Sequence, residues 1–170
     1  VMGRKPEGHV MAETCTRERV TCLFGGSPQF VESIIRAVEE RPAAYDLSAM
    51  TAMHFGWAPL APGSLAAFRR ICGPQLKVYE ICGQTEAVSC HRFHIERHID
   101  MYLAESPQMN HVGQPSPIMA ATVFDAEGND LRGRQGVAGE AVYRSPAMFS
   151  GYYRDQKATE EALAGGWFHS

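Results

Sequence analysis

The chain has 170 residues, of which 45% are hydrophobic and 21% are charged, a composition typical of a globular domain. With a net charge of -3, the chain lacks the excess of basic residues expected of a protein that binds nucleic acid. No apolar run approaches the length of a membrane span, and the first residues lack the pattern of a signal peptide. We therefore expect no nucleic-acid partner and no transmembrane segment.

The first half of the chain alternates predicted strands and helices. Residues 20–24 are rich in β-forming side chains, and Ser27 followed by Pro28 is a typical helix start, with the serine hydroxyl as the cap. The helix that follows has an apolar face and is expected to end before Pro42. The next predicted elements are a strand at 52–55, a helix at 64–72 capped by Gly73, and a strand at 76–81. This alternation predicts parallel strands joined by right-handed crossovers.

The second half changes character after a Pro-, Asn- and Gly-rich stretch at 107–117, which is typical of a loop or linker. It contains predicted strands at 119–125 and 140–144, a turn at 127–130, and a short helix at 156–164. We therefore predict an α/β fold with two portions, an α/β portion over residues 1–105 and a β-rich portion over residues 106–170.

Five cysteines are present, and none forms a C-x-x-C pair with another. An odd number argues against a disulfide framework and favours a reducing compartment, so we expect a cytoplasmic protein. Free cysteines usually act as small buried hydrophobic residues, and we expect that role for most of these.

A polar segment follows the strand predicted at 76–81, with the sequence Cys82-Gly83-Gln84-Thr85-Glu86. Ligands of open α/β sheets bind beyond the carboxyl ends of the strands. Gly83 permits close approach of a ligand to the backbone, Thr85 offers a hydroxyl to a phosphate, and Glu86 offers a hard oxygen ligand to Mg²⁺. Taken alone, these residues fit a solvated polar loop better than a binding site.

Further motifs accompany this segment along the chain: Gly56-Trp57-Ala58-Pro59-Leu60, His111-Val112-Gly113-Gln114-Pro115, Gly139-Glu140, Gly151-Tyr152 and Gly166-Trp167-Phe168. In this order the motifs resemble those of the adenylate-forming (ANL) superfamily, which includes acyl- and aryl-CoA synthetases, luciferases and the adenylation domains of peptide synthetases. The resemblance extends from residue 19 to residue 170. It implies part of the large domain of that fold, a parallel α/β portion followed by a β-rich, barrel-like portion.

The resemblance also implies roles for individual residues. It places Gly56, Trp57, Ala58 and Pro59 on one side of the adenine of ATP, and the backbone of Glu80, Ile81 and Cys82, followed by Gly83 and Gln84, on the other. Thr85 would contact the α-phosphate and Glu86 would hold Mg²⁺, which makes these two the implied catalytic residues.

The implied reaction has two steps. A carboxylic acid attacks the α-phosphate of ATP and gives an acyl-adenylate and pyrophosphate, and the thiol of CoA or of a carrier protein then displaces AMP. CoA is favoured as the acceptor because Gly151-Tyr152-Tyr153 and Gly166-Trp167-Phe168 resemble the CoA ligases more closely. An adenylation domain that serves a carrier protein is the alternative, and the acid, whether fatty, aryl or other, is left open.

Two positions depart from the family pattern. Cys82 replaces the tyrosine whose ring stacks on adenine, and Trp57 replaces the second glycine of Gly-Gly-Ala-Pro. A thiol has no ring face, so we hypothesise that the Trp57 indole supplies the missing surface. An orientation of Trp57 into the acyl pocket or the core is an equally supported alternative.

Several parts of the family pattern are expected outside this chain. They are the phosphate loop before Val1, the ribose-binding aspartate after Ser170, and the C-terminal domain with its lysine. We therefore expect an internal fragment of the large domain that is inactive by itself.

A metal-binding module is the rival class of function. On a helix, His91, His94 and His98 would share one face, with Cys90 and Glu96 nearby, and three imidazoles can bind zinc. No second Cys/His pair completes a tetrahedral site, so a partly solvated polar helix or loop is the favoured interpretation. A non-catalytic metal- or ligand-binding fragment stays open as an alternative.

Overall fold

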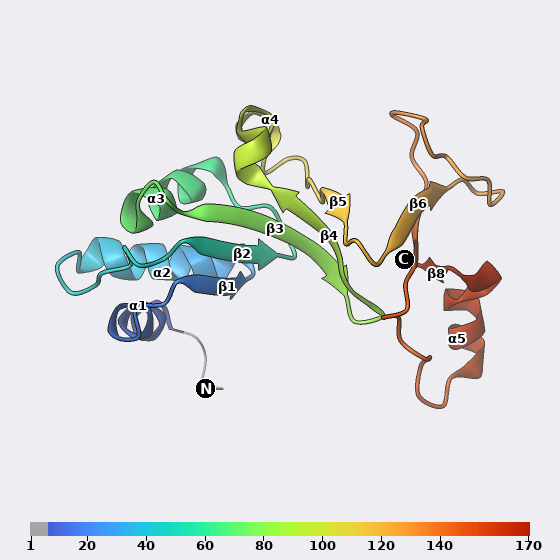
Figure 1. Ribbon diagram of the computed structural model, residues 1–170, viewed down its shortest axis with the longest axis horizontal. Coiled ribbons are helices and arrows are strands. Elements are labelled where there is room, and N and C mark those ends of the chain that lie inside the picture. The colour runs from blue at the N-terminus through green and yellow to red at the C-terminus, as the bar shows by residue number, and fades with distance from the viewer. Residues whose placement is uncertain (1–6) are drawn as a thin grey trace. The chain divides into compact units, whose positions relative to one another are not determined.

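The computed structural model describes residues 7–170, with the backbone alone described at 88–90 (Figure 1). The chain forms two compact units. The first is the chain up to Ile81 together with Phe93–Gly113, and the second is Cys82–Arg92 together with Gln114–Ser170. The boundary predicted between residues 105 and 106 stays a prediction.

The first unit contains helices that alternate with parallel strands. Its elements begin in the order α1 (Gly8–Arg17), β1 (Cys22–Gly26), α2 (Pro28–Glu40), β2 (Ala52–Gly56), α3 (Pro62–Cys72) and β3 (Lys77–Gln84). Strand β2 pairs in parallel with β1 and with β3, so that Leu23, Met53 and Val78 lie in one row. The predicted alternation and its parallel pairing are confirmed.

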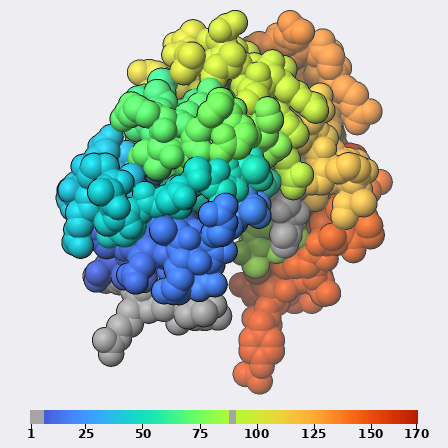
Figure 2. Space-filling view, turned by 60° about the vertical axis from the view of Figure 1, so that its left-hand side comes forward, coloured from blue at the N-terminus to red at the C-terminus, as the bar shows by residue number. Residues whose placement is uncertain are grey.

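The core of the first unit is formed by inward residues of the strands and by one face of each of α2 and α3. Met53, Phe55 and Val78 are fully buried, and the residues of α2 and α3 in the same core include Val31, Ile34, Ile35, Val38, Leu65 and Phe68. In the space-filling view, the segments from α1 to α3, blue to green, form a closely packed surface (Figure 2). The apolar face predicted for α2 is therefore its core face.

Helix α2 starts at the predicted residue but not by the predicted contact. Pro28 is its first residue, and Ser27 before it has an extended backbone. The Ser27 hydroxyl makes no capping hydrogen bond, so the expected side-chain cap is wrong. Proline is preorganised for this position because its φ is already helical. Helix α3 ends as predicted, with the N–H of Gly73 donating to the carbonyl of Arg69.

The largest departure from the predicted elements is a hairpin. Strand β3, expected to end at residue 81, continues to Gln84, and β4 (Ala87–His94) begins after the two-residue turn of Thr85 and Glu86. The sheet has the order β1-β2-β3-β4-β5, in which β5 is Gln114–Pro115. The chain continues from β4 into a 3-10 helix, η1 (Ile95–His98), and α4 (Ile99–Glu105).

The second unit contains a three-stranded antiparallel sheet of order β6-β7-β8. Its strands are β6 (Ala120–Phe124), β7 (Glu140–Arg144) and β8 (Phe168–His169), and between β7 and β8 lie α5 (Gln156–Ala162) and the 3-10 helix η2 (Ala164–Gly166). The strands predicted at 119–125 and 140–144 are confirmed. Ala87, Met119, Tyr143 and Phe168 form the buried core of this unit.

No helix in the described part of the chain is both long enough and apolar enough to cross a lipid bilayer.

Candidate functional site

The loop after β2 carries the first group of candidate residues, in the first unit. Gly56 pairs with Ile81 of β3, and a side chain at Gly56 would collide with the Ile81 carbonyl oxygen. Glycine is therefore required for the two strands to approach here. Trp57 follows with φ 72°, and its side chain is 83% exposed. The indole therefore lies outside the core of the first unit.

The backbone of Trp57 gives a first prediction. A positive φ is costly for a residue with a Cβ and inexpensive for glycine. We expect Trp57→Gly to be more stable than Trp57→Ala by about 1 kcal/mol, because both substitutions remove the exposed indole and only glycine relieves the backbone. Urea unfolding of the two variants measures the difference. Equal stabilities would contradict the left-handed conformation of this residue.

The far end of the same loop is fixed by α4. The Tyr102 hydroxyl accepts a hydrogen bond from the Leu60 N–H at 3.0 Å and donates one to the Leu60 carbonyl at 2.7 Å. Ser106 Oγ donates to the same carbonyl at 3.2 Å. All three residues are buried, and burial raises the pKa of Tyr102 to about 12. The loop therefore has a defined position on the body of the first unit.

Glu80 is a buried carboxyl group on β3, beside Phe55 of β2. Its exposed fraction is 2%, and among the described residues no partner hydrogen-bonds its Oε2. Burial raises the pKa of Glu80 from 4.5 to about 7. The family resemblance implies a role only for the backbone of this residue. The burial of its side chain has a local signal, the alternation of the strand, which places Glu80 in phase with the buried Val78.

The second group of candidate residues lies in the second unit. Cys82, Gly83 and Gln84 form the end of β3, which corrects the expectation that they belong to a loop. Thr85 and Glu86 form the hairpin turn, where Thr85 is exposed and Glu86 is partly exposed. A hydroxyl and a carboxylate are therefore presented at the tip of a hairpin.

The Glu86 side chain has one hydrogen-bond partner in the described part of the chain. The Tyr152 hydroxyl donates to Glu86 Oε1 at 3.0 Å. No Lys, Arg or His among the described residues pairs with this carboxylate. Sequence reasoning missed this contact because 66 positions separate the two residues.

The histidines of the rival metal cluster do not share a helix. His91 and His94 lie on β4 and His98 lies in η1, so both the helical face and the polar helix or loop predicted around His91 and His94 are wrong. His91 packs edge-on against Tyr143, and His98 stacks on Phe93. Within the described residues no group of three or more His, Cys, Asp or Glu is arranged to hold a metal, and the side chain of Cys90 lies outside the described set.

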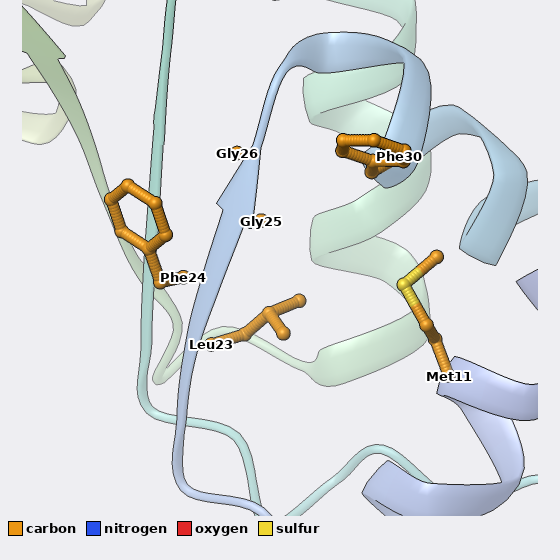
Figure 3. Close-up of a pocket in the computed structure, with 6 residues that line it drawn as sticks. All are labelled: Met11, Leu23, Phe24, Gly25, Gly26 and Phe30. Atoms are coloured by element: carbon orange, nitrogen blue, oxygen red, sulfur yellow. The ribbon is translucent and has the colours of Figure 1, made fainter. Parts of the chain in front are cut away.

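An apolar cavity of about 240 Å³ opens beside β1 in the first unit. Figure 3 shows Met11 and Phe30 on one side of the strand and Phe24 on the other. Leu23, Gly25 and Gly26 complete the lining, and no residue assigned to the nucleotide belongs to it.

Comparisons with known proteins agree on one family. The family model described as AMP-binding enzyme matches residues 1–153. The chain is 30% identical over 129 residues to the acyl-CoA ligase lcsD of Purpureocillium lilacinum, covering 75% of this chain and 31% of that protein. It is 34% identical over 119 residues to the human long-chain-fatty-acid–CoA ligase 6, covering 68% of this chain and 15% of that protein.

A solved structure shows the same fold. The amide bond synthetase McbA from Marinactinospora thermotolerans superposes with a TM-score of 0.74 at 28% identity, over 99% of this chain and 32% of that one. The chain thus spans about a third or less of the length of the relatives named here. The mixed α/β fold, the ordered motifs and the family match lead to one conclusion: the chain belongs to the AMP-binding enzymes, within the adenylate-forming superfamily.

Proposed function

We propose that this chain is a piece of the large domain of an ATP-dependent carboxylic acid:CoA ligase, an acyl-CoA synthetase. The observation that carries the proposal is the hairpin tip, where Thr85 presents a hydroxyl and Glu86 presents a carboxylate that no described cation neutralises. The similarity to lcsD and to the human relative, which are named as an acyl-CoA ligase and a long-chain-fatty-acid–CoA ligase, supports this class.

The donor chemistry at the hairpin tip fits magnesium. Mg²⁺ prefers hard oxygen ligands and commonly binds proteins through one or two carboxylates, taking its other ligands from phosphates and water. Glu86 supplies one such carboxylate. When bound, Mg²⁺ offsets the negative charge of the phosphates of ATP.

The residues of this chain then bind and orient ATP for the first step. Gly56, Trp57, Ala58 and Pro59 contact the adenine, as does the backbone of Glu80, Ile81 and Cys82 with Gly83 and Gln84. The Thr85 hydroxyl donates to an α-phosphate oxygen, where negative charge accumulates as the acid attacks. The acid's oxygen bonds to the α-phosphorus, pyrophosphate leaves, and the thiol of CoA displaces AMP from the acyl carbon.

The test of this function is ATP–pyrophosphate exchange by the full-length protein with a panel of fatty, aryl and hydroxy acids, followed by assays with different acceptors. Exchange with at least one acid, followed by formation of an acyl-CoA, is expected. Exchange without CoA transfer would favour a carrier-protein acceptor, or an amine acceptor such as the name amide bond synthetase indicates for McbA. Absence of exchange with every acid would contradict the proposal. The 170-residue chain alone is the matched control and is expected to be inactive.

Trp57 is proposed as the stacking partner of adenine, because its indole is exposed and Cys82 offers no ring. An aromatic contact is worth about 0.5–1.5 kcal/mol beyond burial, so Trp57→Ala in the full-length protein should raise the dissociation constant of ATP about two- to twelve-fold. Adding Cys82→Tyr should restore much of the affinity. Calorimetric titration with ATP measures both variants.

The alternative for Trp57 is the acyl pocket, and the same variants decide between the two. If Trp57→Ala changes which acids are accepted and leaves ATP affinity unchanged, the indole contacts the acid and the stacking hypothesis is wrong.

A further inference from the structure

Two motifs far apart in the sequence meet at the hairpin turn of the second unit. The Tyr152 hydroxyl donates to Glu86 Oε1 at 3.0 Å, so Gly151-Tyr152 and Gln84-Thr85-Glu86 are joined by a side-chain contact. The bond uses one carboxylate oxygen of Glu86 and leaves the other without a partner among the described residues. One oxygen of the Glu86 carboxylate is therefore hydrogen-bonded, and the other is available as a ligand atom.

The backbone around both residues fixes this contact. The Phe149 N–H donates to the Glu86 carbonyl at 2.9 Å, and Ala87 pairs with Met148 in a β-bridge. The loop that carries Tyr152 is thus hydrogen-bonded to the same turn that carries Glu86. These backbone hydrogen bonds place the Tyr152 hydroxyl within reach of the Glu86 carboxylate.

Tyr152 is held through both its ring and its backbone. Its ring meets Phe149 edge-to-face with centroids 4.9 Å apart, and its backbone N–H donates to Thr159 Oγ1 at 2.9 Å. Gly151 before it has φ 143°, and a Cβ there would lie 2.7 Å from the Thr159 side chain. Glycine at this position therefore allows the loop to pack on α5 and to direct the next residue to Glu86.

The chemistry of the donor is suited to a metal-binding carboxylate. A glutamate side chain loses considerable rotamer freedom when it is ordered, and a hydrogen bond to one oxygen restricts it before any metal arrives. A lysine or arginine partner would do the same but would neutralise the charge that attracts a dication. A neutral phenol orients the carboxylate and leaves it negatively charged.

We propose that Tyr152 is a positioning residue for Glu86, holding its carboxylate in the orientation that binds Mg²⁺ with ATP. This inference rests on the proposed function, in which Glu86 binds the metal. In this proposal Tyr152 acts through its hydrogen bond to Glu86.

The test uses the full-length protein and a non-hydrolysable ATP analogue with a methylene bridge between the α- and β-phosphates. Calorimetry gives the affinity of the analogue at increasing Mg²⁺ concentrations, so the readout is binding and not turnover. Tyr152→Phe keeps the ring contact with Phe149 and removes only the hydroxyl. We expect it to raise the Mg²⁺ concentration for half-maximal effect about ten-fold, as loss of a hydrogen-bond partner of a metal ligand does. The adenylation rate at saturating Mg²⁺ should change much less.

The matched control is Tyr153→Phe, one position further along the chain. Tyr153 is 85% exposed, and its hydroxyl makes no hydrogen bond to the described residues. Tyr153→Phe should leave the Mg²⁺ dependence unchanged. If Tyr152→Phe also leaves it unchanged while Glu86→Gln shifts it, the positioning role is overturned and the proposed function stands. If Glu86→Gln has no effect either, the metal role of Glu86 fails, and this inference fails with it.

Discussion

At pH 8, Glu80→Gln is expected to raise the free energy of unfolding by about 3 kcal/mol, the equivalent of moving one pKa from 4.5 to about 7. The cause is burial, since the exposed fraction of Glu80 is 2% and its Oε2 has no partner among the described residues. Glutamine keeps the shape of the side chain and cannot ionise. Urea unfolding at a series of pH values measures the difference.

The pH dependence follows from the direction of the shift. The folded-state pKa lies above the unfolded value, so between pH 4.5 and about 7 the folded protein binds more protons than the unfolded chain. Stability contributed by the protonated group is therefore fully present below 4.5 and is lost as the pH rises through about 7. Glu80→Gln should match the unsubstituted protein near pH 4.5 and exceed it above pH 7.

Removal of an exposed carboxylate is the control for a general charge effect. Glu13 is exposed on α1, and Glu13→Gln should leave the slope of stability against pH unchanged over the same range. If Glu80→Gln does not raise the free energy of unfolding at pH 8, or raises it equally at every pH, then ionisation of the buried carboxyl group does not destabilise the protein.

Glu86→Gln in the full-length protein is expected to slow adenylation about 100-fold or more, and to have a much smaller effect on thioester formation from a preformed acyl-adenylate. The amide preserves the size of the side chain and removes the charge that a hard dication prefers. In the proposed reaction Mg²⁺ would offset the charge of the triphosphate, which is cleaved in the first half-reaction, whereas only the single phosphate of AMP takes part in the second. Single-turnover measurements of the two half-reactions separate these effects.

The control for this variant is Glu127→Gln, at an exposed turn after β6, which should leave both half-reactions unchanged. Equal losses in the two half-reactions of Glu86→Gln would point to a folding defect and contradict the metal-binding role.

The sequence predicted the elements that carry a strong periodic pattern. Strand β7 was predicted with its observed bounds, and α3 was predicted to end at Gly73, because alternation and a glycine cap are local signals. Helix α1 was not predicted. Only Ala12 and Cys15 of that helix are buried, and these two small residues give a weak sequence signal.

The errors around the hairpin have a related cause. Strand β4 contains histidine and arginine among its apolar residues, so it lacks a clear strand pattern. The three-residue spacing of His91 and His94 is also compatible with one face of a helix. The bond between Tyr152 and Glu86 joins residues that are 66 positions apart. No local pattern reports contacts of that range.

The two hydrogen bonds between Tyr102 and Leu60 make the loop after β2 dependent on a helix that comes 42 positions later. The Leu60 amide bonds to a phenol and not to a neighbouring strand, so it becomes open to deuterium whenever α4 separates from the loop, even while the sheet stays intact. Its exchange rate therefore reports a local opening of α4 rather than global unfolding. The loop reaches its final position only after the chain has been made and folded as far as α4.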